Sequence, residues 1–560
     1  MGGGVKGVAD GGLAGTPFPP ALSSSAMPHP PPTSSAQRRR RWLVLALVVT
    51  YALFCATHLG GAYWDSDEGL NLMKGRLFGL GHPLYTRIWS DQPPGYTVLL
   101  AAAFSVFGPS VAAARAVTAA FGLAAAFAAS SVARSLGGGW WAGLAAAVVL
   151  AVAPNFFWAS RAAMIGLPAL ALATAAMACA LRFGATGRRR DLALAGLLLG
   201  ASAWLKLIGA YLIVPIALAV WLRRRGERHA YDPAMGCWDD VIRDLAVLAL
   251  TTAAPLALML AAFDARALLA QVVGTVVGAR GAAPLDVAWN AGKLADWLIA
   301  RDLGRPDWTF ADHAALIAPA LAGLVVGVRR KRDAGVVVAA WLALTVIALL
   351  LQNPLWPKHH FLALLVVLAP LAGVGIEWAV GAIRDALRAR GGESTFAARS
   401  GAIVAALAGA FIVAATLIPL PTALAADRAR LLAVPFKESG KLPSRSDSWR
   451  TLDDAIAFLR DHTAAGDWVV TDQAYAAFRA DRPIPPELAV VSSKRITTGG
   501  LTADDVIRIT DEAHRAAVLF WDGDRLTDAF PAFVQWVGWN YDKVDGAPAG
   551  WTLWLRKGHG

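Results

Sequence analysis

The chain has 560 residues, of which 56% are hydrophobic and only 16% charged, and its mean hydropathy is +0.48. A soluble protein carries about 25% charged residues, so this composition excludes an ordinary soluble enzyme and indicates a polytopic membrane protein. The net charge of +12 does not indicate nucleic-acid binding, because the arginine runs stand at the ends of apolar segments, where they act as topology signals.

The first elements in the chain set the orientation of the rest. Residues 1–41 are rich in Gly, Pro and Ser and end in four arginines, which predicts a disordered cytoplasmic segment. The run 42–62 is then the first span. The run 97–107 is too short to cross a bilayer, and we expect a re-entrant or interfacial helix that leaves Arg188 to Arg190 inside. Further spans are predicted at 111–133, 140–155, 164–183, 191–205, 207–222, 241–263, 313–328, 335–352, 361–381 and 400–420, about eleven in all.

This topology predicts three parts. Residues 1–41 are the cytoplasmic N-terminus and residues 42–424 are a transmembrane catalytic domain. Its first extracytoplasmic loop is 63–96 and its largest is 264–312. After the last span the charge density rises, so residues 425–560 are expected to form a soluble extracytoplasmic α/β domain. Its elements are an amphipathic helix in "TLDDAIAFLRDH" and strands in "WVV", "AAVLFWD" and "GWTLWLRKG".

Charged residues at the outer face suggest a transfer reaction. A catalyst there has no access to cytoplasmic nucleotides, so a lipid-linked donor is expected. Sugar transfer from such a donor needs a carboxylate that deprotonates the acceptor and cations that hold the phosphate leaving group. Asp67 and Glu68 are the candidate catalytic carboxylates, and burial beside Tyr63 and Trp64 is expected to raise a carboxylate pKa. The candidate phosphate-binding residues are Arg115, Arg161, Lys206, Lys358, His359 and His360.

Some of these residues also have ordinary structural explanations. Asp65 and Glu68 can simply cap and solvate the helix that starts there, where Ser66 and Asp67 are good N-cap residue types. Lys206 can snorkel at a span end instead of binding phosphate. The cysteines lie far apart and show no metal-ligand spacing. The sequence therefore predicts no metal site or other cofactor, and it does not support a divalent metal. Positioning of the loop or of the acceptor is assigned to Asp65, Asp91, Gln92 and Tyr96.

The stretch "DSDEGLNLMKGRLFGLGHPLYTRIWSDQPPGY" resembles the first extracytoplasmic loop of the GT-C glycosyltransferases that use polyprenyl-phosphate sugars. These include protein O-mannosyltransferases and lipid A aminoarabinose transferases. The shared pattern is an acidic pair, a helix, a Gly-x-Pro-x-Tyr turn and a Pro-Pro pair. The resemblance covers residues 42–380 and implies a GT-C fold, an inverting transfer and Asp67 as the general base. Later segments resemble the family in the same order: "FGPSVAAARAV", "SRAAMIGLPAL", "GLLLGASAWLKLIGAYLIVP" and "PLWPKHHFLALLVVLAPLAG".

Two positions depart from the family pattern. Aminoarabinose transferases have a Glu-Lys pair before the Pro-Pro, whereas this chain has Asp91 and Gln92, so a phosphate-binding lysine is missing. Many members also carry an acid where this chain has Gly166, which argues against a second acidic site and against a metal.

The sequence therefore predicts a bacterial glycosyltransferase of the cytoplasmic membrane, with its N-terminus inside and its C-terminal domain outside. Its expected partners are a polyprenyl-phosphate sugar, the bilayer and a protein, lipid or polysaccharide acceptor, with no nucleic acid. The alternative is a transporter or flippase of a lipid-linked sugar, which would be expected to show internal repeats and broken helices near the midplane. A non-catalytic membrane anchor would not need so many spans or the acids of the first loop.

Overall fold

The computed structural model describes most of the chain, which divides into two compact units, residues 1–50 and 51–560. The predicted disorder of residues 1–33 and most of the predicted span 400–420 lie outside the described residues. The helix α1 (Ser34–Ala56) begins before the apolar run, so residues 34–41 are helical and not disordered as predicted. Arginine favours helices, which explains the early start. The described residues are 34–56, 59, 65–230, 237–275, 277–278, 284–299, 310–353, 355–389, 403, 405–410, 452–513 and 516–558.

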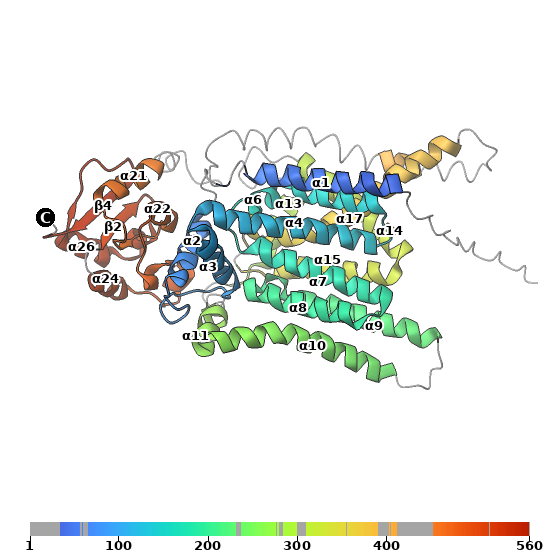
Figure 1. The fold of residues 1–560 in the computed structure, drawn as a ribbon, viewed down its shortest axis with the longest axis horizontal. Helices are drawn as coiled ribbons and strands as arrows, with labels where there is room; N and C mark the ends of the chain where they lie inside the picture. The colour runs from blue at the N-terminus through green and yellow to red at the C-terminus, as the bar shows by residue number, and fades with distance from the viewer. Residues whose placement is uncertain are drawn as a thin grey trace, which may run out of the picture. The chain divides into compact units, whose positions relative to one another are not determined.

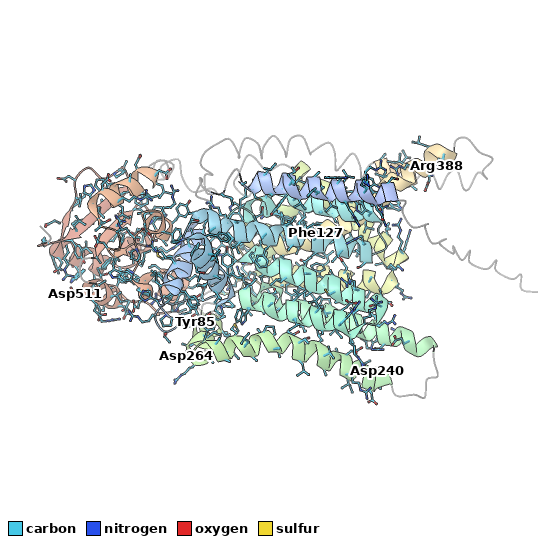
Figure 2. The ribbon with its side chains drawn as sticks, in the orientation of Figure 1. Tyr85, Phe127, Asp240, Asp264, Arg388 and Asp511 are labelled. Carbon is cyan, nitrogen blue, oxygen red and sulfur yellow. The ribbon has the colours of Figure 1, made fainter. Side chains whose placement is uncertain are left out.

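The membrane part is helical, as predicted. Within the described residues, 6 helices are long and apolar enough to cross a bilayer. Exposed apolar side chains such as Phe127, at 49%, are what lipid-facing surfaces require (Figure 2). The six are α4 (Val111–Ser135), α7 (Gly166–Thr186), η1 with α9 (Leu207–Leu212 and Ile213–Ala230), α10 (Cys237–Ala262), α15 (Arg332–Leu350) and α17 (Leu362–Ala389).

Several other helices lie among the predicted spans and loops. α3 (Gly95–Phe107) has 13 residues, which agrees with the prediction that this run is too short to span. α5 (Trp140–Val152) also has 13 residues and is shorter than the predicted span 140–155, because Pro154 ends it and begins a new helix. The rest are α6 (Pro154–Ala159), α8 (Arg189–Leu205), α11 (Ala265–Leu269), the π-helix η2 (Ala270–Gly274), α13 (Val287–Ile299), α14 (Phe310–Arg330) and α16 (Pro357–His360).

The long helices pack side by side. α7 packs against α4 and α8, α8 against α10, and α17 against α5 and α14 (Figure 1). Two glycines allow α14 and α17 to touch through their backbones. A Cβ atom on Gly323 would lie 1.8 Å from the carbonyl oxygen of Leu371, and one on Gly375 would lie 1.9 Å from that of Pro319. Any larger residue at either position would force these helices apart.

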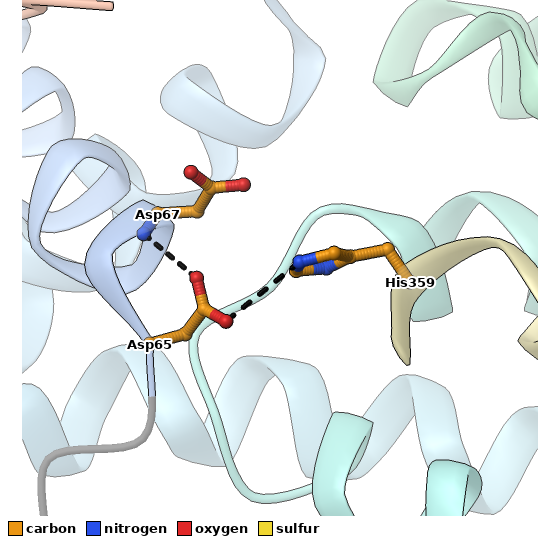
Figure 3. Close-up of side chains that lie close together, drawn as sticks. All are labelled: Asp65, Asp67 and His359. Carbon is orange, nitrogen blue, oxygen red and sulfur yellow. Dashed lines mark hydrogen bonds and ion pairs between the residues drawn. The ribbon is translucent and has the colours of Figure 1, made fainter. Parts of the chain in front are cut away.

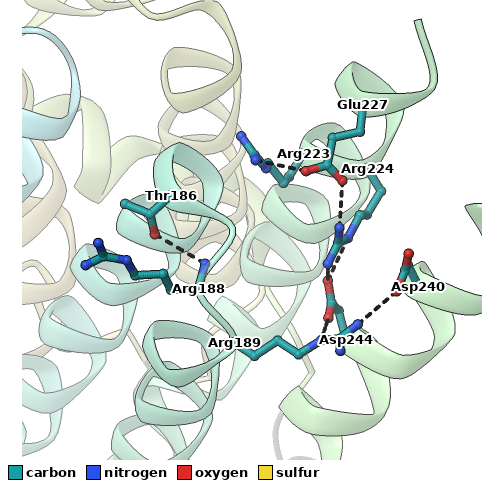
Figure 4. Close-up of polar contacts among 8 residues, drawn as sticks. All are labelled: Thr186, Arg188, Arg189, Arg223, Arg224, Glu227, Asp240 and Asp244. Carbon is teal, nitrogen blue, oxygen red and sulfur yellow. Dashed lines mark hydrogen bonds and ion pairs between the residues drawn. The ribbon is translucent and has the colours of Figure 1, made fainter. Parts of the chain in front are cut away.

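An ion-pair network joins α8, α9 and α10 at the end where α8 begins (Figure 4). The buried carboxylate of Asp244 accepts from Arg189 Nε at 2.7 Å and pairs with Arg224 Nη2 at 2.7 Å. Arg189 also binds Asp240 at 2.9 Å. Lys206 follows the last residue of α8, so this network and Lys206 lie at opposite ends of that helix.

A small α/β domain follows the membrane part. Its four-stranded sheet has the order β1-β2-β4-β3, in which β1 and β2 are parallel and the other pairs are antiparallel. The predicted amphipathic helix and three predicted strands are confirmed, and β3 was not predicted. The strands are β1 (Val469–Val470), β2 (Ala517–Trp521), β3 (Tyr541–Lys543) and β4 (Trp551–Arg556), and the helices are α21 (Leu452–His462), α22 (Ala474–Arg479), η3 (Pro486–Leu488), α23 (Ser493–Thr497), α24 (Ala503–Glu512), α25 (Arg525–Ala529) and α26 (Pro531–Asn540).

This domain shares one apolar core with the first loop. α2 (Ser66–Gly79) packs against α22, and a Cβ atom on Gly69 would lie 2.4 Å from the backbone nitrogen of Tyr475. Phe104 of α3 and Phe478 of α22 have ring centroids 5.7 Å apart. The first loop and the soluble domain therefore cover each other's apolar faces, as two layers of one fold do.

Candidate functional site

The first turn of α2 presents two acids to a histidine of α16. Asp65 has extended backbone angles and caps the helix, because its Oδ1 accepts from the backbone nitrogen of Asp67 at 2.9 Å. Its Oδ2 lies 3.7 Å from Nε2 of His359 (Figure 3). Asp65 is buried, whereas the Asp67 side chain is exposed. The burial expected for Asp67 is therefore wrong, because the helix start turns its carboxylate outward. Tyr63 and Trp64 lie outside the described residues.

The same three residues offer a possible cation site. Ligand atoms of Asp65, Asp67 and His359 lie within 4.8 Å of one another. Carboxylate oxygens and an imidazole nitrogen suit Mn²⁺ or Zn²⁺ better than Mg²⁺, which prefers oxygen ligands alone. Two acids close together in the chain and a histidine almost 300 residues later form this group, which the spacing of the cysteines did not indicate.

Glu68 lies in a buried ion pair and does not face the solvent. Arg115 Nε donates to Glu68 Oε1 at 2.7 Å and Arg115 Nη2 donates to Oε2 at 2.8 Å, and both side chains are 0% exposed. The backbone nitrogen of Ala163 donates to Oε1 at 2.8 Å. Glu68 thus joins α2, α4 and the turn before α7. The pair satisfies both charges internally, so Glu68 and Arg115 serve to position the first loop and do not offer a free base or phosphate ligand.

Two further predicted residues lie in the packing around this pair. Tyr96 Oη and Thr118 Oγ1 are 2.7 Å apart and buried, which fixes α3 against α4. Arg161 is buried in the turn after α6, where Nη1 donates to the carbonyl of Phe157 at 3.1 Å and the guanidinium lies 3.2 Å from the centroid of the Phe157 ring. Tyr96 therefore holds α3 against α4, and the guanidinium of Arg161 contacts Phe157.

The two neighbouring histidines, His359 and His360, make different contacts. The imidazole of His359 stacks edge-on to Trp158, with ring centroids 5.3 Å apart. His360 is buried, and its Nδ1 accepts from the backbone nitrogen of Trp356 at 3.0 Å. Burial lowers the pKa of His360 well below its usual value, and Lys206, His359 and Lys494 add to this shift. His360 is therefore a neutral imidazole whose Nε2 carries the proton, so it offers a hydrogen-bond donor and no positive charge. The side chain of Lys358 lies outside the described residues.

Three lysines from distant segments gather near the acids, and we call Lys74, Lys206 and Lys494 the lysine cluster. Burial lowers the pKa of Lys74, while Asp91 and Asp67 oppose this shift and Lys206 adds to it. Burial also lowers the pKa of Lys206, Asp67, Asp91 and Asp65 oppose that shift, and Lys494 adds to it. The charges of Asp67 and Asp91 thus act on the same two ammonium groups, those of Lys74 and Lys206.

Hydrogen bonds from the first loop itself and from η2 hold the turn that carries Asp91 and Gln92. Ser90 Oγ and Tyr85 Oη both donate to the carbonyl oxygen of Gln92, at 3.1 and 2.9 Å. Gln271 of η2 accepts from the backbone nitrogen of Ser90 at 2.9 Å and donates to the carbonyl of Tyr85 at 2.6 Å. The large loop therefore supports the first loop, and the carboxylate of Asp91 is left to face Lys494, whose Nζ lies 3.4 Å away.

Lys74 and Lys494 were not among the predicted site residues. Lys74 lies seven residues after Asp67 on the predicted helix, so the helical period places both on one face, and this signal could have identified it. Lys494 lies 403 residues from Asp91. Nothing in its local sequence indicates that it reaches the first loop.

Comparisons with known proteins find a matching family model and solved structures of similar fold. The family model for dolichyl-phosphate-mannose-protein mannosyltransferase matches residues 91–234. The structure is similar to that of ArnT from Cupriavidus metallidurans bound to undecaprenyl phosphate, with a TM-score of 0.61, 14% sequence identity, and coverage of 92% of this chain and 98% of that one. For ArnT in the apo state the TM-score is 0.54 at 13% identity, with the same coverage of 92% and 98%. The search of curated proteins found no match.

Proposed function

We propose that this chain, whose fold is similar to that of ArnT, is a GT-C glycosyltransferase that transfers a sugar from a polyprenyl-phosphate-linked donor to an acceptor at the outer face of the cytoplasmic membrane, with Asp67 as the general base. The single observation that carries the proposal is the exposed Asp67 carboxylate, whose charge acts on the ammonium groups of Lys74 and Lys206. A base must reach the acceptor, and cations must hold a phosphate nearby. Undecaprenyl phosphate bound to ArnT supports this class of donor.

In the proposed reaction, Asp67 accepts the proton of an acceptor hydroxyl or amine as that atom attacks the anomeric carbon. The bond from this carbon to the phosphate oxygen breaks, and polyprenyl phosphate leaves with the electron pair. The nucleophile enters from the face opposite the leaving group, so the transfer of the hexose or pentose inverts the anomeric configuration. Lys206 and Lys74 stabilise the charge that develops on the phosphate, and His360 donates a hydrogen bond through Nε2.

The proposed topology places the N-terminus and the Arg189–Asp244 network inside. The candidate site and the soluble domain then lie outside, because Lys206 and Arg189 are at opposite ends of α8. The acceptor, whether protein, lipid or polysaccharide, reaches Asp67 from the solvent. The donor reaches it from the bilayer, and a bacterial cytoplasmic membrane is the proposed location.

The test uses the purified full-length protein with a panel of polyprenyl-phosphate sugars and measures release of polyprenyl phosphate when acceptor is added. Asp67→Asn keeps the shape of the side chain but cannot take the proton, so turnover should fall about 10²–10⁴-fold. No hydrogen bond or ion pair of the Asp67 carboxylate is found within the described residues, so folding should not change.

The matched control is Asp504→Asn, an exposed acid in the first turn of α24, which should keep full turnover. Normal turnover of Asp67→Asn would overturn the assignment of the base. A protein that moves the intact donor across the bilayer without releasing polyprenyl phosphate would be the rival transporter.

A further inference from the structure

The soluble domain touches the first loop through a short charged surface on and near α23. Arg87 Nε lies 2.6 Å from Glu487 Oε1. The guanidinium of Arg495 lies 5.3 Å from the centroid of the Trp89 ring. Lys494 Nζ lies 3.4 Å from Asp91 Oδ2. The soluble domain therefore contacts three alternate residues of the first loop just before the Pro-Pro turn: Arg87, Trp89 and Asp91.

α23 is held firmly within its own domain. Ser492 caps it by accepting from the backbone nitrogen of Arg495 at 3.2 Å. The buried guanidinium of Arg495 donates to the carbonyls of Glu487 at 2.6 Å, Val490 at 3.2 Å and Gly500 at 3.1 Å. Arg495 thus donates to local backbone carbonyls while its guanidinium lies near the ring of Trp89, and the neighbouring Lys494 faces a carboxylate of the first loop.

The contact of Lys494 with Asp91 is long and partly open to solvent. The lysine side chain is 39% exposed, and its distance to Asp91 is longer than the usual 2.7–2.9 Å of a charge-assisted hydrogen bond. Lys74 Nζ lies 3.5 Å from Ser90 Oγ, and Ser90 is next to Asp91, so lysines from two separate parts of the fold flank the same turn. The charge of Lys494 also lowers the pKa of Lys206. Cations held near one another by separate parts of the fold favour an anion between them.

We propose that Lys494 is a ligand of the donor phosphate, so that the soluble domain completes the phosphate-binding side of the site together with Lys206 and Lys74. This inference rests on the proposed function for the identity of the donor, but it concerns binding of the phosphate group and not the base. It gives the soluble domain a direct role: the lysine absent before the Pro-Pro turn is supplied from a position 403 residues further along the chain.

The test measures affinity of the full-length protein in detergent for undecaprenyl phosphate, with inorganic phosphate as a separate arm. Lys494→Ala should weaken undecaprenyl phosphate binding about 5-fold or more, as expected for loss of one partly exposed charge-assisted contact, and Lys494→Arg should recover most of it. Lys206→Ala serves as the comparison within the cluster. Lys543→Ala, an exposed lysine on β3 of the same domain, is the matched control and should bind normally.

A second variant separates phosphate binding from simple attachment of the domain. If Lys494 only tethers the soluble domain, Asp91→Asn and Lys494→Ala should weaken binding equally, because both remove the same contact. If Lys494 binds the phosphate, Asp91→Asn removes a competing anion and should strengthen binding. Equal weakening by both variants, or unchanged affinity of Lys494→Ala, would overturn the proposal. If inorganic phosphate bound as tightly as undecaprenyl phosphate, the site would be one for free phosphate, and this result would also overturn the proposal.

The outcome is independent of the proposed general base. Lower affinity of Lys494→Ala together with full turnover of Asp67→Asn would support the proposed phosphate site and contradict the assignment of Asp67 as the base. Normal affinity of Lys494→Ala together with reduced turnover of Asp67→Asn would support Asp67 as the base and contradict Lys494 as a phosphate ligand. In steady-state transfer, Lys494→Ala should raise the donor KM more than it lowers kcat, whereas Asp67→Asn should lower kcat.

Discussion

Arg115 donates two parallel hydrogen bonds to Glu68, and both side chains are fully buried where α2, α4 and the turn before α7 meet. Breaking one side of such a pair leaves an uncompensated buried charge. We therefore expect Arg115→Ala to destabilise the protein by about 3–5 kcal/mol and to lower the thermal unfolding temperature in detergent. Arg508→Ala removes an exposed pair with Glu512 and should leave that temperature nearly unchanged. If both variants changed the unfolding temperature equally, the buried pair would contribute no more to stability than the exposed pair.

Chelation tests whether Asp67 acts as a base or as a metal ligand. A carboxylate that coordinates a cation is a poor proton acceptor, so the two roles compete. We expect turnover to continue after removal of divalent cations with EDTA, because the proposed reaction uses the free Asp67 carboxylate. Loss of turnover with EDTA and its return with Mn²⁺, absent in His359→Ala, would instead make Asp65, Asp67 and His359 a metal site.

The proposed topology can be tested by labelling in a variant whose native cysteines are replaced by serine. Thr86 is exposed in the first loop and Ala185 is exposed near the end of α7. Thr86→Cys should react with a membrane-impermeant thiol reagent applied from outside, and Ala185→Cys should react only after the membrane is opened. Gly69 is unsuitable, because a side chain there would collide with Tyr475. Reversed labelling would contradict the placement of the site outside.

Stability should depend on pH through Asp524 of the soluble domain. Its Oδ1 accepts from the backbone nitrogen of Leu526 at 2.7 Å, whereas Oδ2 is buried and no hydrogen-bond partner for it is found in the described part of the chain. Burial and the neighbouring Asp472 raise the pKa of Asp524 well above its ordinary value, against the opposing effects of Leu526 and Arg525. The folded state therefore binds a proton that the unfolded state has already released.

Because the pKa of Asp524 is raised on folding, stability falls as pH increases from the unfolded value of about 3.9 through the folded value. Asp524→Asn keeps the cap oxygen and cannot ionise. The variant should gain stability relative to the parent protein, and the gain should be larger at pH 8 than at pH 5 in thermal unfolding of the full chain. A gain independent of pH would show that Asp524 does not titrate in this range.

The sequence alone determined the features that depend on local pattern. Runs of about 20 apolar residues predict membrane helices because backbone groups in lipid must bond within their own segment. Alternation and flanking turns likewise predicted the strands at Val469, Ala517 and Trp551, which the structure confirms. The cap at Asp65 also follows from a local preference, and the break at Lys206 follows from the spacing of two apolar runs.

Only the tertiary structure decided which charged residues face the solvent. Asp67 and Glu68 are adjacent in the chain, yet one is exposed and the other is sealed in a pair with Arg115, because successive residues of a helix point about 100° apart. Lys494 reaches Asp91 across 403 residues because the first loop and the soluble domain must cover one apolar core. Burial and long-range pairing depend on which surfaces meet, and this information is not carried by any single segment of the sequence.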